Sequence, residues 1–183
     1  MRTQYDEADI KRVVERLALR IAGAFPPDQP LSVIGIRTRG EAVAERLANL
    51  LGRKGFTKIG RGVLDITFYR DDLSGKGAKP LIRPTEINFD LDGKPALLVD
   101  DVIFTGRSIR AAMDALADFG RPSRIRLAVL VDRGGRELPI QPDFVGLMLK
   151  EVPSDHRKAR IEDQRIEEAR VFAEMMQGGM QRR

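Results

Sequence analysis

Cysteine is absent from this chain of 183 residues, and histidine occurs once, at His156. The chain therefore cannot form a disulfide, a thiolate nucleophile or a cysteine-based zinc site, and one histidine cannot make a histidine-rich metal cluster. Tryptophan is also absent, and the two tyrosines and eight phenylalanines do not alternate with basic residues. A platform of aromatic rings that stacks on single-stranded RNA is therefore not expected.

Long hydrophobic runs are missing as well. The longest apolar stretches, 95–99 and 125–131, are far too short to cross a bilayer, and residues 1–15 are charged where a signal peptide needs an apolar segment. We therefore expect a cytoplasmic protein with no membrane contact. A chain of this length fits a single domain, which buries roughly 70% of the surface that its unfolded form exposes.

The net charge is mildly positive, +5 at pH 7, so the chain favours anionic partners such as phosphorylated metabolites or nucleic acid. Basic and acidic residues are mixed along most of the sequence, which is typical of a solvated surface. Only 156–160 and 182–183 are locally basic. Charge alone does not choose between a small anion and RNA.

Hydrophobic periodicity predicts that helices alternate with strands. In chain order we expect a helix from Asp6 to about Ala22, a strand at 31–36, a helix after Gly40, strands at 64–68, 86–89 and 95–99, a helix after Arg107 with Ile109, Ala112, Met113 and Leu116 inward, and a strand at 125–131. This order predicts an α/β fold with a doubly wound, mostly parallel sheet flanked by helices, whose ligands bind beyond the carboxyl ends of the strands. The loops after Ile36, Val99 and Val131 should then meet at one site.

The segment with the most specific chemistry is 99–108, Val-Asp-Asp-Val-Ile-Phe-Thr-Gly-Arg-Ser. Its second half begins a predicted helix, where backbone N–H groups and two hydroxyls can hold a phosphate dianion and Gly106 lets the backbone approach closely. The adjacent carboxylates of Asp100 and Asp101 would repel that phosphate. They suit sugar hydroxyls that donate hydrogen bonds, or a Mg²⁺ ion. A ribose 5-phosphate with its metal offers both.

A purely structural interpretation of these residues stays open. Asp100 and Asp101 can form turn hydrogen bonds, and Thr105 or Ser108 can cap a helix. The segment is not a nucleotide-binding P-loop, because the glycine-rich loop with lysine is absent, and no dinucleotide fingerprint opens a predicted helix.

Arg37-Thr38-Arg39-Gly40 forms a second candidate site, between a predicted strand and a predicted helix. Bidentate arginine and helix-terminal N–H groups both favour a concentrated negative charge such as pyrophosphate. Without the 99–108 segment, an ordinary basic turn would be as good an interpretation. With it, an anion-binding role is favoured.

The 99–108 segment resembles the 5-phosphoribosyl pyrophosphate (PRPP) signature of type I phosphoribosyltransferases. Together with 34–40, 64–74 and 130–140, it is similar to the PyrR family, whose members are pyrimidine-operon regulators and uracil phosphoribosyltransferases. The similarity extends over about residues 10–146. The blocks Tyr-Arg-Asp-Asp-Leu-Ser and Asp-Arg-Gly-Gly-Arg-Glu-Leu-Pro separate this family from other phosphoribosyltransferases.

The resemblance implies a role for each segment. Asp100 and Asp101 would hold the ribose hydroxyls, and Thr38 and Arg39 would face the pyrophosphate, with Asp100, Asp101 and Arg39 as the catalytic set. The full implied substrate-binding set is Thr38, Arg39, Asp100, Asp101, Val102, Ile103, Phe104, Thr105, Gly106, Arg107, Ser108, Arg133 and Ile140, of which Thr105–Ser108 would bind the 5-phosphate and Arg133 and Ile140 the uracil. Tyr69, Arg70, Asp71 and Asp72 would belong to a flexible loop, and the Arg37–Thr38 peptide can be cis.

The implied reaction is attack of a uracil nitrogen on the anomeric carbon of PRPP as Mg²⁺-pyrophosphate leaves, giving UMP. It requires no protein nucleophile. The implied partners are PRPP, uracil and UMP, with pyrimidine-operon leader RNA bound by the same protein as an attenuator, in a homodimer or homotetramer. A purine or orotate phosphoribosyltransferase without an RNA role is the alternative.

The sequence also departs from the family pattern. Gly135 stands where members often carry histidine, Ser154 replaces a common threonine, and 146–153 is longer than usual. These differences leave the expected phosphate sites unchanged. We expect one domain over 1–183, with a core at about 30–150 and with the first helix and the tail as a small hood or extension.

Overall fold

A computed structural model of the chain describes residues 7–69 and 83–149. Within them, five parallel strands form one sheet in the spatial order β2-β1-β3-β4-β5. The strands are β1 Leu31–Ile36, β2 Ile59–Leu64, β3 Pro95–Ile103, β4 Arg124–Asp132 and β5 Phe144–Met148. The helices are α1 Glu7–Ala22, α2 Arg39–Gly52 and α3 Arg107–Leu116, with the short 3-10 turns η1 Thr67–Tyr69 and η2 Ala117–Phe119.

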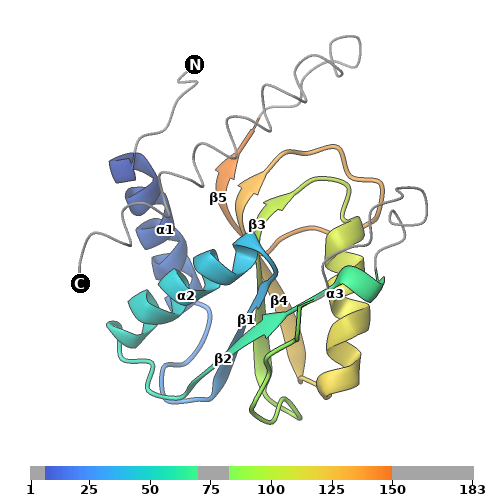
Figure 1. Cartoon of the computed structure of the whole chain (residues 1–183). Coiled ribbons are helices and arrows are strands. Elements are labelled where there is room, and N and C mark those ends of the chain that lie inside the picture. Colours follow the sequence, from blue (N-terminus) through green and yellow to red (C-terminus); the bar gives the residue numbers. More distant parts are fainter. Residues whose placement is uncertain (1–6, 70–82, 150–183) are drawn as a thin grey trace.

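The helices cover both faces of the sheet. Figure 1 shows α1 and α2 on one face and α3 on the other, so the sheet is doubly wound as the alternation of helices and strands predicts. All the strand pairs run parallel. Their carboxyl ends therefore lie along one edge, where Figure 1 shows the arrowheads of β3, β4 and β5. None of the described helices is long and apolar enough to span a bilayer.

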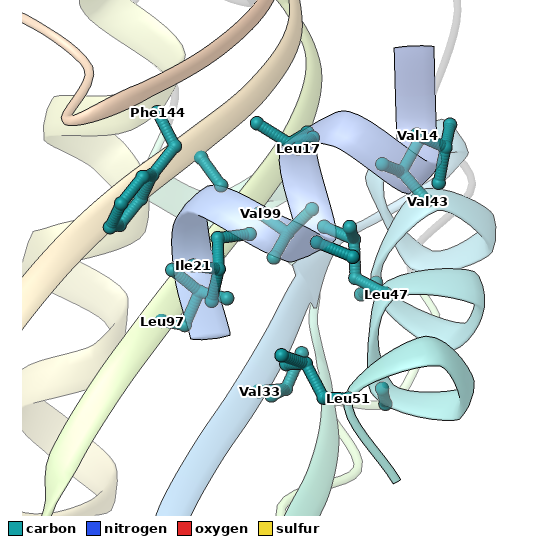
Figure 2. Close-up of a cluster of buried hydrophobic side chains, with 14 of the residues drawn as sticks. Val14, Leu17, Ile21, Val33, Val43, Leu47, Leu51, Leu97, Val99 and Phe144 are labelled. Atoms are coloured by element: carbon teal, nitrogen blue, oxygen red, sulfur yellow. The ribbon is translucent and has the colours of Figure 1, made fainter. Parts of the chain in front are cut away.

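Successive residues of the central strand β3 point to opposite faces and so build two separate cores. Leu97 and Val99 pack against α1 and α2, whereas Ala96 and Leu98 pack against α3. Figure 2 shows the first core, in which the inner side chains of α1 and α2 meet those of the sheet. Leu17, at 0% exposure, is one of them, and burying such a side chain contributes about 1.5–3 kcal/mol.

Two glycines allow helices to approach the sheet closely. A Cβ added at Gly35 in β1 would lie 2.6 Å from the Cα of Glu41 in α2, and one at Gly146 in β5 would lie 2.8 Å from Cγ1 of Val13 in α1. Backbone atoms cannot move aside as a flexible side chain can. Gly35 therefore sets the first turn of α2 directly against the end of β1, which places the following site residues.

Two of the predicted strands are wrong. The strand expected at 64–68 lies earlier, at β2, and Phe68 is 76% exposed in the turn η1. The strand expected at 86–89 reduces to one antiparallel bridge between Val63 and Glu86. Its apolar residues Ile87 and Phe89 pack over Gly62 and Gly60 of β2, which have no side chains of their own. The alternation of apolar residues at 86–89 therefore reflects packing against β2 and not a strand of the sheet.

Other boundaries also differ from the expectation. β3 extends four residues beyond Val99, because Asp100 and Ile103 pair with residues of β4. β5, a five-residue strand with Gly146 at its centre, was not predicted. Met113 was expected inward but is 37% exposed, and the buried positions of α3 include Ala111 and Ala115.

Candidate active site

The three loops that were expected to meet follow β1, β3 and β4, which are neighbours in the sheet. All three leave the carboxyl edge, and Figure 1 shows the loops after β3 and β4 running together towards the start of α3. Two helices, α2 and α3, begin at this edge. Their amino termini carry partial positive charge and free N–H groups, so the edge favours anions.

The acidic pair lies at the centre of this edge, on β3. The side chain of Asp100 is turned inward at 7% exposure, and its Oδ1 accepts the backbone N–H of Asp101 at 2.9 Å. Asp101 is more open, with a side chain 20% exposed. One carboxylate is thus fixed by its surroundings, and the other faces solvent beside it.

The turn after β1 lies directly against the acidic pair. A Cβ at Gly40 would lie 2.6 Å from the Val99 carbonyl oxygen and 3.2 Å from Oδ1 of Asp100. Only glycine fits there, so this residue brings two of the predicted segments into contact. The Arg37–Thr38 peptide is cis, as the resemblance implied.

Arg39 is the first residue of α2, and its side chain lies near the carboxylate of Asp101. Its Nη1 is 4.0 Å from Oδ2 of Asp101, and its side chain is 44% exposed. An exposed pair at this distance contributes about 0–1 kcal/mol. A strongly anionic ligand can therefore compete for Arg39 at little cost.

The predicted phosphate-binding residues Thr105–Ser108 lie partly in the loop Phe104–Gly106, called the phosphate loop below, and partly in the first turn of α3, at Arg107 and Ser108. Gly106 has φ +92, a left-handed conformation that glycine adopts without a steric cost. The Arg107 N–H donates to the Thr105 hydroxyl at 3.4 Å. Val102 and Ile103, expected in this loop, are the last residues of β3 instead.

The loop after β4 lies against the phosphate loop along its whole length. The Arg133 N–H donates to the Ile103 carbonyl at 3.0 Å, and its guanidinium stacks 4.6 Å from the centre of the Phe104 ring. Ile140 lies close to Gly106, where an added Cβ would be 3.5 Å from its Cβ. The residues assigned to uracil and to phosphate are therefore neighbours.

Sequence reasoning missed a largely buried ion pair between Asp132, the last residue of β4, and Arg136 in the loop that follows. Their side chains are 8% and 12% exposed, and Nη2 of Arg136 donates to Oδ2 of Asp132 at 2.7 Å. The sequence did indicate that Asp132 needs a partner, because an aspartate at the end of an apolar strand is costly to bury unless it is paired. The arginine four residues later was the nearest candidate.

The chain after β2 reaches the same edge. Burial raises the pKa of Asp65, but hydrogen bonds from Thr67 and from the Arg83 N–H, together with the charge of Arg37, outweigh burial and lower it. The Tyr69 hydroxyl bonds to Asp118, which raises the pKa of Tyr69. The loop residues Arg70, Asp71 and Asp72 lie outside the described residues.

The expected Mg²⁺ ion can be compared with the side chains that are available to bind it. In the described part of the chain no three histidine or acidic side chains gather closely enough to hold an ion. Asp100 and Asp101 offer only two adjacent carboxylates. Magnesium keeps most of its ligands as water or substrate oxygens, so these residues fit an ion that arrives with a diphosphate.

Comparisons with known proteins show the family of the chain. The family described as "Phosphoribosyl transferase domain" matches residues 2–161. Proteins named "Bifunctional protein PyrR" are similar over most of their length: that of Roseiflexus sp. (strain RS-1) is 51% identical over 149 residues, which cover 81% of this chain and 80% of the relative. That of Deinococcus radiodurans is 47% identical, with 85% of each chain covered.

Solved structures share the fold at low sequence identity. A hypoxanthine phosphoribosyltransferase from Staphylococcus aureus has a TM-score of 0.62 at 17% identity, covering 79% of this chain and 74% of the other. The HGPRT-ase of Leishmania tarentolae in complex with GMP has a TM-score of 0.63 at 15% identity, with 83% of each chain covered. The chain therefore belongs to the phosphoribosyltransferase family and, within it, to the bifunctional PyrR proteins.

Proposed function

We propose that this protein is a uracil phosphoribosyltransferase that makes UMP and pyrophosphate from uracil and PRPP, and a UMP-sensing, RNA-binding regulator of pyrimidine operons by attenuation. One observation carries the proposal beyond family membership. The Arg37–Gly40 turn lies against Asp100 through Gly40, and the phosphate loop follows on the same strand. Sites for a diphosphate, a sugar and a monophosphate are thus adjacent, in the order in which PRPP carries these groups.

Each group of PRPP has a chemically matched partner. The carboxylates of Asp100 and Asp101 accept hydrogen bonds from the ribose hydroxyls, which are neutral donors. The 5-phosphate binds to Thr105–Ser108, where hydroxyls and N–H groups meet the positive end of α3. Thr38 and Arg39 bind the pyrophosphate at the amino end of α2.

The reaction breaks the bond between the anomeric carbon and a pyrophosphate oxygen, whose electron pair leaves with the diphosphate. A uracil nitrogen forms the new bond to that carbon, and its proton passes to solvent. Arg39 stabilises the charge that grows on the departing pyrophosphate, and Asp100 and Asp101 keep the sugar aligned. Asp100 and Asp101 are the residues that would hold a Mg²⁺ ion arriving with the pyrophosphate, and such an ion would neutralise further charge on the leaving group.

The base site is assigned to the loop after β4, where Arg133 and Ile140 border the phosphate loop. The alternative bases, purine or orotate, are not favoured, because the similar proteins at 47–51% identity are PyrR proteins. The flexible-loop role of residues 69–72 is a proposal that depends on the resemblance alone, as is assembly into a homodimer or homotetramer.

The proposed RNA-binding role is supported by membership of the PyrR family and by exposed basic residues. Lys11 and Arg16 on α1 and Arg53 and Lys54 after α2 are exposed. Contact of such residues with RNA phosphates should weaken as salt rises, with a slope of about 0.7 per phosphate neutralised on single strands. An RNA affinity that does not change with salt would contradict this contact.

Two measurements test the two halves. Radiolabelled uracil, PRPP and Mg²⁺ should give UMP, while hypoxanthine and orotate should give no nucleotide. Formation of a purine nucleotide instead would show that the base pocket is wrongly assigned. Isothermal titration with UMP, followed by leader RNA with and without UMP, should show RNA binding that UMP strengthens. No binding in either condition would remove the regulatory half.

A further inference from the structure

Arg136 connects two loops of the candidate site, and the function proposed above assigns it no role. It lies between the phosphate loop Phe104–Gly106 and the loop after β4, which Figure 1 shows running together. Its side chain is 12% exposed. A buried guanidinium must be neutralised and hydrogen-bonded to be tolerated, so its partners show what it holds in place.

Those partners come from both loops. Nη2 donates to the Asp132 carboxylate at 2.7 Å, which supplies the opposite charge. Nε donates to the Ile140 carbonyl at 2.9 Å. Nη1 donates to the Phe104 carbonyl at 2.8 Å and to the Gly134 carbonyl at 3.3 Å. Of these four acceptors, only Phe104 belongs to the phosphate loop.

The next carbonyl of the phosphate loop is held from the same side. The backbone N–H groups of Glu137 and Leu138 donate to the Thr105 carbonyl at 3.0 and 3.1 Å. The first residue of α3 is held by the same loop, because the Arg107 side chain pairs with Glu137 at 2.9 Å. Two successive carbonyls of the phosphate loop are therefore turned towards the loop after β4.

Peptide geometry then fixes where the donors point. In a planar trans peptide, the C=O of one residue and the N–H of the next point in opposite directions. In the described residues the cis bond is Arg37–Thr38, so the peptides after Phe104 and Thr105 are trans. With both carbonyls turned to the loop after β4, the N–H groups of Thr105 and Gly106 must point away from it, to the side where α3 begins.

We infer that Arg136 is a positioning residue for the phosphate cradle, which orients the Thr105 and Gly106 N–H groups towards the 5-phosphate by holding the carbonyls on the opposite side. It touches no substrate atom. The inference rests on the proposed function, because it concerns the phosphate end of that same site. It goes beyond that function in assigning affinity for phosphate to a side chain of the neighbouring loop.

The test compares two ligands that differ only in the phosphate. Isothermal titration gives the dissociation constants of UMP and of uridine for the wild-type protein and for Arg136→Gln, and their ratio isolates the contribution of the phosphate. If the substitution only loosened the loop after β4, UMP and uridine would both bind more weakly by the same factor, and the ratio would not change. We expect the ratio of uridine to UMP constants to fall by about tenfold or more in Arg136→Gln.

Arg126→Gln is the matched control. Arg126 also pairs with an aspartate, Asp143 at 3.2 Å, but it lies near the start of β4, away from the carboxyl edge. For Arg126→Gln, the ratio of the uridine and UMP dissociation constants should equal that of the wild type. Far-UV circular dichroism confirms folding, and if Arg136→Gln does not fold, Arg136→Lys replaces it. A lysine keeps the charge beside Asp132 but cannot bond the Phe104 and Ile140 carbonyls together.

A folded Arg136 variant with the wild-type ratio would overturn the inference, as would a wild-type protein that binds UMP no better than uridine. Failure of the proposed function looks different. If the wild-type protein makes no UMP, the same variants are titrated with ribose 5-phosphate, which carries no base. Weaker binding by Arg136→Gln than by Arg126→Gln then supports the inference without uracil, and equal binding rejects it.

Discussion

The phosphate loop and the turn after β1 both precede a helix at the carboxyl edge of the sheet, but they are held in different ways. The phosphate loop is fixed by hydrogen bonds from Arg136 and from the backbone of the neighbouring loop. The Arg37–Gly40 turn is hydrogen-bonded at its first residue, whose N–H donates to the Leu64 carbonyl and whose guanidinium pairs with Glu86. Its approach to β3 is set by close contact, since Gly35 and Gly40 leave no space for a Cβ. One candidate anion site is therefore positioned mainly by hydrogen bonds from a neighbouring loop, and the other mainly by close backbone contacts that only glycine allows.

The largest effect is expected where the close contact is broken. A Cβ in Gly40→Ala would meet the backbone of β3, and such overpacking costs about 1–3 kcal/mol. Because the displaced turn carries Thr38 and Arg39, uracil turnover should fall by about 100-fold. Steady-state kinetics and thermal unfolding measure both effects. The control is Gly52→Ala, where nothing lies within 4 Å; if both variants behave alike, the close contact has no importance.

The next effect concerns the acidic pair between the two anion sites. Asp100→Asn and Asp101→Asn each replace a charged acceptor, and hydrogen bonds to charged groups contribute about 1.5–3 kcal/mol. PRPP affinity should therefore fall by roughly 10- to 150-fold in each variant. Titration with PRPP and Mg²⁺ measures this, with Asp114→Asn on α3 as the control. Unchanged affinity in both active-site variants would remove the sugar role.

A smaller effect is expected at Gly135, in the loop that holds the phosphate loop. Gly135 has φ +69, and an added Cβ would lie 2.4 Å from the Phe104 ring. Gly135→Ala should cost about 1–2 kcal/mol from the left-handed backbone alone, with a further loss from the contact. Chemical denaturation measures the free energy of unfolding. The double variant with Phe104→Leu should recover the contact part only; no recovery would mean that backbone strain accounts for the whole loss.

The smallest effect depends on pH. Hydrogen bonds and the charge of Arg37 lower the pKa of Asp65 although burial opposes them. A lowered folded-state pKa stabilises the protein above the unfolded value near 3.9, and this contribution disappears as pH falls through the folded value. Asp65→Asn should therefore be less stable than wild type at pH 7, and the difference should shrink below about pH 4. A difference that grows on acidification would contradict the direction of this shift.

The sequence predicted the fold better than it predicted the details of the site. The parallel sheet followed from the alternation of strands and helices and from the run 125–131, because strands covered on both faces are nearly continuously apolar. The strand predicted at 86–89 was wrong because its alternating apolar residues pack over the glycines of β2, and this pattern cannot be distinguished from that of a paired strand. Asp100 was placed after the strand because the apolar run ends at Val99, but pairing with β4 extends the strand through the two carboxylates.

The site residues were identifiable from local chemistry, but the contacts between them were not. Thr105–Ser108 form the predicted loop and first turn of a helix, since glycine and hydroxyl residues after a strand are characteristic of that geometry. The hydrogen bonds from Arg136 to Phe104 join residues 32 positions apart. Such a contact depends on how β3 and β4 pair, which no local pattern in the sequence specifies.

A crystal structure with PRPP and Mg²⁺ tests the central claim most directly. We predict that the 5-phosphate contacts the N–H groups of Thr105 and Gly106, that the ribose hydroxyls donate to Asp100 and Asp101, and that the pyrophosphate lies at the start of α2. A ligand bound away from the carboxyl edge, or one with its diphosphate in the Thr105–Ser108 loop, would contradict it.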